Sequence, residues 1–509
     1  MCKAGQVQEA YELAKTDLAA RAAGIWGQKI IIFSKEVPKT DSAARPADIW
    51  AQRAVGWVLY YMIKADSEVG DYAKLLEHIN ELKSLDQLTI ANDSMIFDNV
   101  QFQIANFIKN NIFLTDIEAS SKLSTLFSKF KDYEFKPSIG HSFLLQAILK
   151  FENWSEMPDF FDWWNLDDLS SKDYEPYVNQ KGQKIMTLAE RAFIANSKAL
   201  LRLNDLGRIE EFLPKLDNLM NNHKEMMYPG YFYGKLLLAL GSNRDEALKV
   251  IIPFARKKAT EFWVWQLLSD VFTDDEDKQL ACLLRAVHCR TQETFLGKVH
   301  IKLANLYIKR GLLNSARYHI DAVTRCYVSQ GWRLPNEIEC WIHQPWLNST
   351  IPDGNISIDY MSITDAILCN GAEECIAVVT YVDQTNHKAF IIYGKEKRTV
   401  QKLRFRVQAG NILKLHYITD NEGKMKIISS TKFQLPSNLN YAKYVEGKIN
   451  KRDDKEFAFL KSGSVSCFVS PNIVKKYNLK NGDNIKCLII YDYDKKKNAW
   501  NWVCVNAKK

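Results

Sequence analysis

The chain has 509 residues, of which 47% are hydrophobic and 25% are charged, a composition typical of folded globular proteins. It is too long for one small core, and its composition excludes a fully disordered or fibrous protein. The formal net charge of +8 is unevenly distributed: residues 370–509 hold 26 Lys and Arg against 13 Asp and Glu, whereas the rest of the chain holds 42 against 47. An acidic body followed by a basic C-terminal quarter indicates that this quarter contacts a polyanion.

No apolar run approaches the roughly 20 residues that a membrane-spanning helix needs. The first residues lack the basic-then-apolar layout of a secretory signal. The 10 cysteines are scattered and none forms Cys-x-x-Cys, which argues against a disulfide framework. Cys340 and His343 have a metal-like spacing but no second ligand pair follows. We therefore expect a cytoplasmic protein without a metal or a cofactor.

The first two-thirds of the chain show helical periodicity and little strict alternation. We expect a helical domain at 1–180, helical repeats at 181–345 and a turn-rich linker at 346–369. Near the N-terminus, residues 17–28 recur as 41–52 with 8 of 12 positions identical, at an offset of 24. This offset is too short for a helical-pair repeat of about 34 residues, so we interpret 22–45 as a duplication inserted as a surface loop. A functional lid is the alternative.

An aromatic cluster lies in the helical stretch between Leu88 and Tyr177, which shows no clear repeat. It is either a peptide-binding patch or part of the core between helices. Adjacent rings on a helix cannot all face one groove, which favours the core. The cluster consists of Trp154, Phe160, Phe161, Trp163 and Trp164.

The clearest repeat unit spans Lys298 to Cys326. A small residue at Ala304 allows two helices to approach, an aromatic follows at Tyr307, Gly311 turns the chain, and Ala316 is the small residue of the return helix. Looser versions precede this unit from Met227 onward. The unit resembles the tetratricopeptide repeat, which implies a helical solenoid that binds a protein partner through its concave surface.

After Cys369 the period changes to alternation, with β-branched and aromatic residues and hairpin turns. Five short strands recur in two segments, so we expect two small five-stranded barrels at 370–435 and 441–509. In the first segment the predicted strands are 375–381, 388–393, 402–407, 409–417 and 425–429. In the second they are 444–449, 455–460, 466–470, 481–488 and 500–504, with a short helix at 471–479.

The second barrel carries two motifs at the expected separation, Lys455-Glu-Phe-Ala-Phe-Leu460 and Cys467-Phe-Val-Ser470. They resemble the strand-two and strand-three motifs of cold-shock domains, a branch of the oligonucleotide-binding (OB) barrels. Strand alternation places Phe457 and Phe459 on one face, where Phe468 joins them to stack unpaired bases. Cations close in sequence are expected to bind the phosphates: Lys448, Lys451, Arg452, Lys455 and Lys461.

The sequence departs from that family's motifs where Glu456 and Ala458 replace glycines and Ser470 replaces a histidine. The alternative is that these phenylalanines belong to the barrel core or to a protein-docking face. In the first barrel the matching candidates are fewer and more basic. They are Phe390, Phe405, Arg404 and Arg406.

The order of helical repeats followed by two barrels of the S1 and cold-shock type resembles the repeat-plus-barrel proteins of bacterial TOTE-type conflict systems. That resemblance implies a role in defence against invading nucleic acid. No phosphate-binding loop, His-Glu-x-x-His or Gly-x-Ser-x-Gly motif occurs, so we expect no enzyme and no catalytic residue. We predict an adaptor that binds single-stranded nucleic acid through the barrels and a protein through the repeats. RNA is favoured over DNA. A purely protein-binding scaffold and a concealed metal-dependent nuclease are the alternatives.

Overall fold

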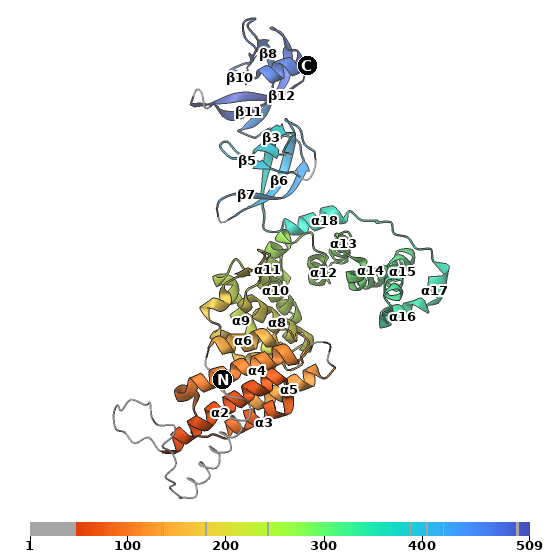
Figure 1. Cartoon of the computed structure of the whole chain (residues 1–509). Coiled ribbons are helices and arrows are strands. Elements are labelled where there is room, and N and C mark those ends of the chain that lie inside the picture. The colour runs from red at the N-terminus through yellow and green to blue at the C-terminus, as the bar shows by residue number, and fades with distance from the viewer. Residues whose placement is uncertain are drawn as a thin grey trace, which may run out of the picture. The chain divides into compact units, whose positions relative to one another are not determined.

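A computed structural model of the chain describes residues 47–113, 115, 117–133, 135, 137–178, 181–241, 244–386, 388–403, 406–420, 422–494 and 498–508. The predicted insertion at 22–45 lies outside these residues. The chain divides into two compact units, Met1–Phe254 and Ala255–Lys509, which are treated separately below (Figure 1). Within the described part, no helix is both long and apolar enough to cross a membrane.

The first unit is helical apart from a two-stranded ribbon, β1 Tyr177–Val178 and β2 Lys184–Ile185. Several helices begin where a short polar side chain accepts a hydrogen bond from a backbone N–H of the first turn, as Thr89, Ser138 and Thr187 do. The helices are α2 Ala47–Val69, α3 Tyr72–Lys83, α4 Ile90–Asn111, α5 Ala119–Phe130, α6 Ile139–Ile148, α7 Met157–Trp164, α8 Leu188–Leu203, α9 Leu206–Asn222, α10 Pro229–Ala239 and α11 Arg244–Lys257, with short 3₁₀ turns at Leu166–Asp168 and Ser171–Tyr174.

One large apolar core runs through these helices, and it contains the aromatic cluster that the sequence left open. Trp154, Phe160 and Trp164 are at most 1% exposed, while Trp163 is partly buried against the core. The Trp164 indole stacks on the His141 ring at a centroid distance of 4.2 Å and donates its N–H to the His141 carbonyl. The cluster is therefore core, as the adjacency of its rings predicted.

The second unit begins with helices joined as antiparallel pairs, α12 Phe262–Val271 with α13 Glu276–Val287 and α14 Gly297–Lys309 with α15 Leu313–Ser329. A 3₁₀ turn at Glu293–Phe295 and the short α16 Asn336–Ile342 accompany them. The predicted repeat residues occupy the positions expected of them. Ala304 and Ala316 are fully buried where the helices meet, and Gly311 turns the chain with a φ of +73°, a conformation that favours glycine.

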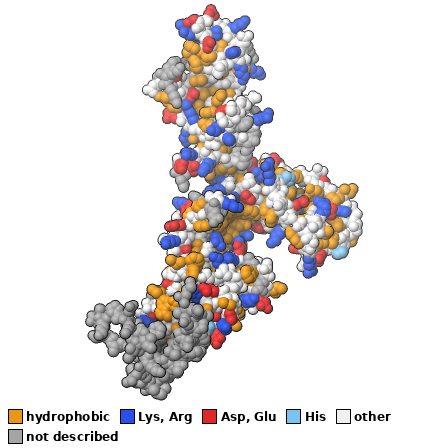
Figure 2. All heavy atoms as spheres, in the orientation of Figure 1, with side chains coloured by type: hydrophobic (Ala, Val, Ile, Leu, Met, Phe, Trp, Pro, Cys, Tyr) orange, Lys and Arg blue, Asp and Glu red, His pale blue; other side chains and the backbone are white. Residues whose placement is uncertain are grey.

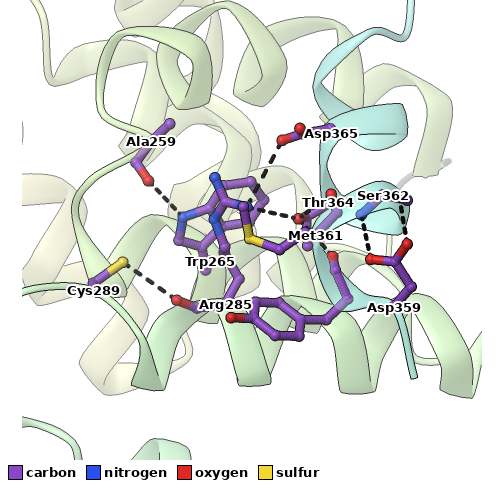
Figure 3. Close-up of polar contacts among 10 residues, drawn as sticks. Ala259, Trp265, Arg285, Cys289, Asp359, Met361, Ser362, Thr364 and Asp365 are labelled. Carbon is purple, nitrogen blue, oxygen red and sulfur yellow. Dashed lines mark hydrogen bonds and ion pairs between the residues drawn. The ribbon is translucent and has the colours of Figure 1, made fainter. Parts of the chain in front are cut away.

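The segment predicted as a linker contains two further helices, α17 Pro345–Ser349 and α18 Tyr360–Leu368. α18 packs on α13 through Arg285, whose guanidinium lies 5.3 Å from the centre of the Trp265 ring. Figure 3 shows Arg285 pointing at α18, where Nη1 lies 3.5 Å from Thr364 Oγ1 and 3.8 Å from Asp365 Oδ1. Arg256 donates from Nε to the Leu368 carbonyl at the end of α18.

Two five-stranded β domains follow. The second is a closed barrel in the order β10-β12-β11-β8-β9, closed by parallel pairing of β10 with β12, and this is the strand order of OB barrels. The first is an open half-barrel in the order β5-β4-β3-β6-β7. The strands are β3 Glu373–Asp383, β4 Lys388–Ile392, β5 Arg398–Gln401, β6 Ile412–Thr419, β7 Met425–Lys432, β8 Ala442–Asn450, β9 Ala458–Ser462, β10 Val465–Val469, β11 Asn484–Asp494 and β12 Ala499–Lys508, with α19 Pro471–Tyr477 after β10.

The first β domain is not the closed barrel that we expected. The predicted position of its third strand is also wrong. The structure forms β5 at Arg398–Gln401, before the predicted 402–407, because pairing with β4 sets Val400 opposite Phe390. This short strand does not form a ladder with β7. Instead, the Gln401 side-chain amide donates to the Met425 carbonyl at the start of β7.

The two β domains contact each other through a shared apolar cluster. Val378, Ile392 and Ile412 of the first meet Ala442, Leu488 and Ile490 of the second. Tyr441, which joins the two domains, donates its hydroxyl to the Ile376 carbonyl at 2.6 Å, and burial raises its pKa to about 12. The tandem therefore has an apolar interface as well as two separate cores.

Candidate nucleic-acid interface

The three predicted stacking residues of the second barrel lie together on its outer surface. The ring centroids of Phe457, Phe459 and Phe468 are 5.7–5.9 Å apart in all three pairs. β9 and β10 pair with Phe459 opposite Phe468. Each ring is half-buried, and the intervening Ala458, Leu460, Cys467 and Val469 point into the barrel core instead. The trio is thus neither core nor fully solvated, which leaves ring surface available to a ligand.

Two of the predicted phosphate-binding lysines stand beside this trio. Lys448 on β8 pairs directly with Lys461 on β9, and both side chains are exposed. Neither has an ion-pair partner among the residues that the structure describes. Gly447 allows this close pairing, since a Cβ there would lie 2.1 Å from the Lys461 carbonyl oxygen. Like charges directly opposite each other on a sheet are unfavourable unless an anion lies between them.

The remaining predicted cations lie in the loop between β8 and β9, where the local charge is mixed. Lys451 is half-buried, and its backbone N–H donates to Asn481 Oδ1 at 3.0 Å. Arg452 and Lys455 are exposed, and Lys455 Nζ lies 3.5 Å from Asp454. Asp453, Asp454 and Glu456 are exposed in the same loop and balance its three cations. The unbalanced positive charge near the rings is therefore that of Lys448 and Lys461.

The first β domain has only part of this arrangement. Phe390 is 39% exposed and contacts Tyr381, which is 59% exposed and opposite it on β3. Val400 continues the same row on β5 and is 47% exposed. Arg406 is exposed. The predicted residues Arg404 and Phe405 lie outside the described residues.

A second group of rings, which sequence reasoning missed, lies on the β11–β12 hairpin. Tyr491 stacks on Trp500 at 5.8 Å with an angle of 12° between the rings, and it also contacts Trp502. Lys443 Nζ lies 4.7 Å from the centre of the Trp502 ring. Arg398, from the first β domain, lies 5.1 Å from the Trp500 ring and pairs with Asp492.

Half-exposed rings and unpaired cations are the two components that hold a single strand without reading its sequence. On the face drawn in Figure 2, Lys and Arg side chains are spread over both β domains, among hydrophobic patches. Within the described part of the chain, no group of three His, Cys, Asp or Glu side chains is placed to hold a metal ion.

Comparison with known protein families gives two matches. Residues 443–507 match the S1/CSD-like domain 2 of the TOTE conflict systems. This stretch covers the closed barrel from β8 to β12, including the three phenylalanines and the Lys448–Lys461 pair. Residues 227–365 match a domain of unknown function, DUF7017, which extends from α10 into α18. No curated protein matches the chain.

The matches support part of what the sequence indicated. Near the C-terminus lies a barrel that is similar to the S1/CSD-like domain 2 of the TOTE conflict systems, and a helical region precedes it. The helix pairs within 227–365 fall in DUF7017, so the comparisons do not assign them to the tetratricopeptide repeats.

Proposed function

We propose that this chain is a non-enzymatic adaptor of a TOTE-type conflict system, and that its S1/CSD-like barrel binds single-stranded nucleic acid, RNA ahead of DNA. One arrangement carries the proposal: Phe457, Phe459 and Phe468 share the outer surface beside the opposed, unpaired Lys448 and Lys461. Unpaired bases stack on such rings at about 1–3 kcal/mol each, while phosphates bind between the lysines. The family match to 443–507 supports the same assignment.

The helices of the chain would bind a protein partner. The helix-turn-helix pairs α12–α13 and α14–α15 have small, fully buried residues where their helices meet, and α14–α15 also has the turn glycine, Gly311, of tetratricopeptide-like units. Stacked helix pairs of this kind present extended concave surfaces to other proteins. The adaptor would thus bind a nucleic acid through its C-terminal barrel and a protein through its helices.

A titration of the full chain with fluorescent single-stranded RNA and DNA at two salt concentrations tests the proposal. We expect salt-sensitive binding that weakens about tenfold or more in Phe457→Ala/Phe468→Ala, because two stacking surfaces are lost. Phe433→Ala, which removes a 45% exposed ring from the first β domain, is the matched control and should bind normally.

Binding that survives in the double variant would reduce the claim to lysine electrostatics. No binding by the folded chain would remove the nucleic-acid function and leave a protein-binding scaffold, for which the exposed Tyr381, Phe390 and Val400 offer a docking row. Incubating the same RNA and DNA with magnesium tests the non-enzymatic part, since cleavage would show a nuclease.

A further inference from the structure

Two adjoining hollows lie along α4 in the first unit, far in sequence from the barrels. The larger, about 390 Å³, is lined by residues of α2 and α4. The smaller, about 200 Å³, is lined by residues of α4 and α6, by Lys150 just after α6, and by Arg191 of α8. Asn106 lines both hollows, so they adjoin, and we call them together the groove. α4 packs between α2 and α6 at this place (Figure 1).

The floor of the larger hollow is a row of side-chain amides. Asn99, Gln103, Asn106 and Asn110 recur at steps of four, three and four, which places them in one stripe along α4. Gln103 is only 7% exposed, and its amide has no hydrogen-bond partner among the described residues although it borders the hollow. The Gln103 amide therefore offers both a donor and an acceptor to a ligand in the hollow.

The smaller hollow is cationic. Lys109, Lys150 and Arg191 line it without any acidic residue, and none of the three forms an ion pair within the part of the chain that the structure describes. Phe143, which is 39% exposed, meets Phe102 of the larger hollow edge to face at 5.1 Å. Along the groove, an amide surface is therefore followed by an aromatic pair and then by a positively charged surface.

We propose that this groove binds an extended acidic peptide segment of the partner protein. Each amide offers a donor and an acceptor, as a peptide backbone requires, whereas phosphate groups offer acceptors only. The stripe spans eleven helical steps, about 16 Å, which equals about five residues of extended chain. Apolar side chains of the peptide would contact Phe102 and Phe143, and its carboxylates would pair with the three cations. This inference rests on the adaptor function and names the site and the chemistry of its protein partner.

The nucleic-acid alternative fits the groove less well. The two phenylalanine rings contact each other, which uses ring surface that bases would need. The larger hollow also contains the exposed carboxylate of Glu68, which lies 3.9 Å from Lys64 and would repel a phosphate chain. In the proposed complex the uncharged peptide backbone would lie along the amides near Glu68, and the peptide carboxylates would pair with the cations of the smaller hollow, which has no acidic residue.

The test uses the full chain and a short fluorescent peptide that repeats Glu-Leu-Asp-Ser. We expect it to bind, the neutral repeat Gln-Leu-Asn-Ser to bind at least tenfold more weakly, and Lys109→Gln/Lys150→Gln/Arg191→Gln to lose about tenfold or more in affinity. Gln103→Leu/Asn106→Leu should also weaken binding, through the amides alone. The matched control Lys131→Gln/Lys172→Gln/Lys224→Gln removes three exposed charges of the same unit outside the groove and should bind normally.

No binding of the acidic peptide, equal binding of the neutral one, or an equal loss in the control would each overturn the proposal. Displacement of the peptide by RNA in the Phe457→Ala/Phe468→Ala chain would assign the groove to nucleic acid instead. Labelled RNA is titrated against every groove variant in parallel. Because the barrel variant and the groove variants then have separate readouts, failure of one function is distinguishable from failure of the other.

Discussion

Lys448 and Lys461 lie directly opposite each other on the antiparallel pair β8–β9, and both ammonium groups are exposed. On an antiparallel pair, facing side chains have their Cβ atoms within about 5.5 Å, so two like charges repel. Sequence proximity grouped both lysines with the loop cations, but only the strand register shows that they form a pair. The barrel accepts an unfavourable contact at the edge of its aromatic trio, which is what a phosphate site requires.

Lys461→Gln should therefore have opposite effects on stability and on binding. We expect the free energy of unfolding of the barrel to rise by about 0.2–1 kcal/mol, since the repulsion is removed. Affinity for single-stranded RNA should fall, and the slope of log affinity against log salt should become shallower by about 0.7 for the lost phosphate contact. Lys424→Gln, at an exposed lysine already paired with Glu422, is the control. An unchanged salt slope in Lys461→Gln would contradict the phosphate assignment.

Gly447 is required by the same strand pair. Its Cβ position would lie 2.1 Å from the Lys461 carbonyl oxygen, a backbone atom that cannot move without opening the ladder. Gly447→Ala should destabilise the barrel by about 1–3 kcal/mol and raise hydrogen exchange in β8 and β9. In Gly207→Ala the nearest atom would be 3.9 Å away, so this control should exchange normally. Normal exchange in β8 and β9 of Gly447→Ala would show that the strands adjust at no cost.

Most strands were predictable because alternation is a local signal, and the predicted strands of the second barrel overlap the observed ones. The exception in the first domain has a physical reason. Residues 402–407 alternate well, yet β5 forms at Arg398–Gln401, where it pairs with β4, and such pairing is not visible in local periodicity. Closure of a five-stranded sheet into a barrel likewise depends on pairing of its third and fifth strands, which are distant in sequence.

The candidate sites divide in the same way. The Phe457, Phe459 and Phe468 cluster follows from alternation within two adjacent strands. The rings of Tyr491 and Trp500 are brought together by the β11–β12 register. The sequence did contain a sign of this group, because aromatic residues occupy alternate positions on both sides of the predicted hairpin at 492–498. The amide stripe on α4 was also visible as a helical period, but only the packing of α2 and α6 makes it a groove.

The buried pair His300–His319 makes the helical pair α14–α15 sensitive to acid. Their Nδ1 atoms lie 2.8 Å apart, and burial lowers the pKa to about 4 for His300 and to about 3 for His319. Between about pH 6.5 and pH 3 the unfolded state binds protons that the folded state does not. Stability is therefore complete above about pH 6.5 and is lost as the pH falls through this window, by an amount of the order of a few kcal/mol.

Hydrogen exchange of the α14–α15 amides at pH 7 and at pH 5, corrected for the intrinsic pH dependence, measures this effect. We expect protection to fall on acidification in the unmodified chain. In His300→Gln, which has one buried histidine fewer, protection should depend less on pH. His343→Gln, at an exposed histidine, should keep the full pH dependence. Equal protection at both pH values in the unmodified chain would refute the linkage.

Arg285 should control how firmly α18 is held on the helical repeats. Its side chain is 12% exposed, lies across the Trp265 ring and reaches Thr364 and Asp365, so removing it leaves a void between α13 and α18 and breaks their polar contacts (Figure 3). We expect Arg285→Ala to raise hydrogen exchange in α18 by about 10- to 100-fold, equivalent to about 1.4–2.8 kcal/mol. Arg285→Lys keeps the charge but loses the planar stacking. Its hydrogen exchange in α18 should therefore lie between that of the unmodified chain and that of Arg285→Ala. The control is Arg290→Ala, at an exposed arginine of the loop that follows α13, which should leave exchange in α18 unchanged. Equal exchange in Arg285→Ala and Arg290→Ala would mean that apolar packing alone holds α18.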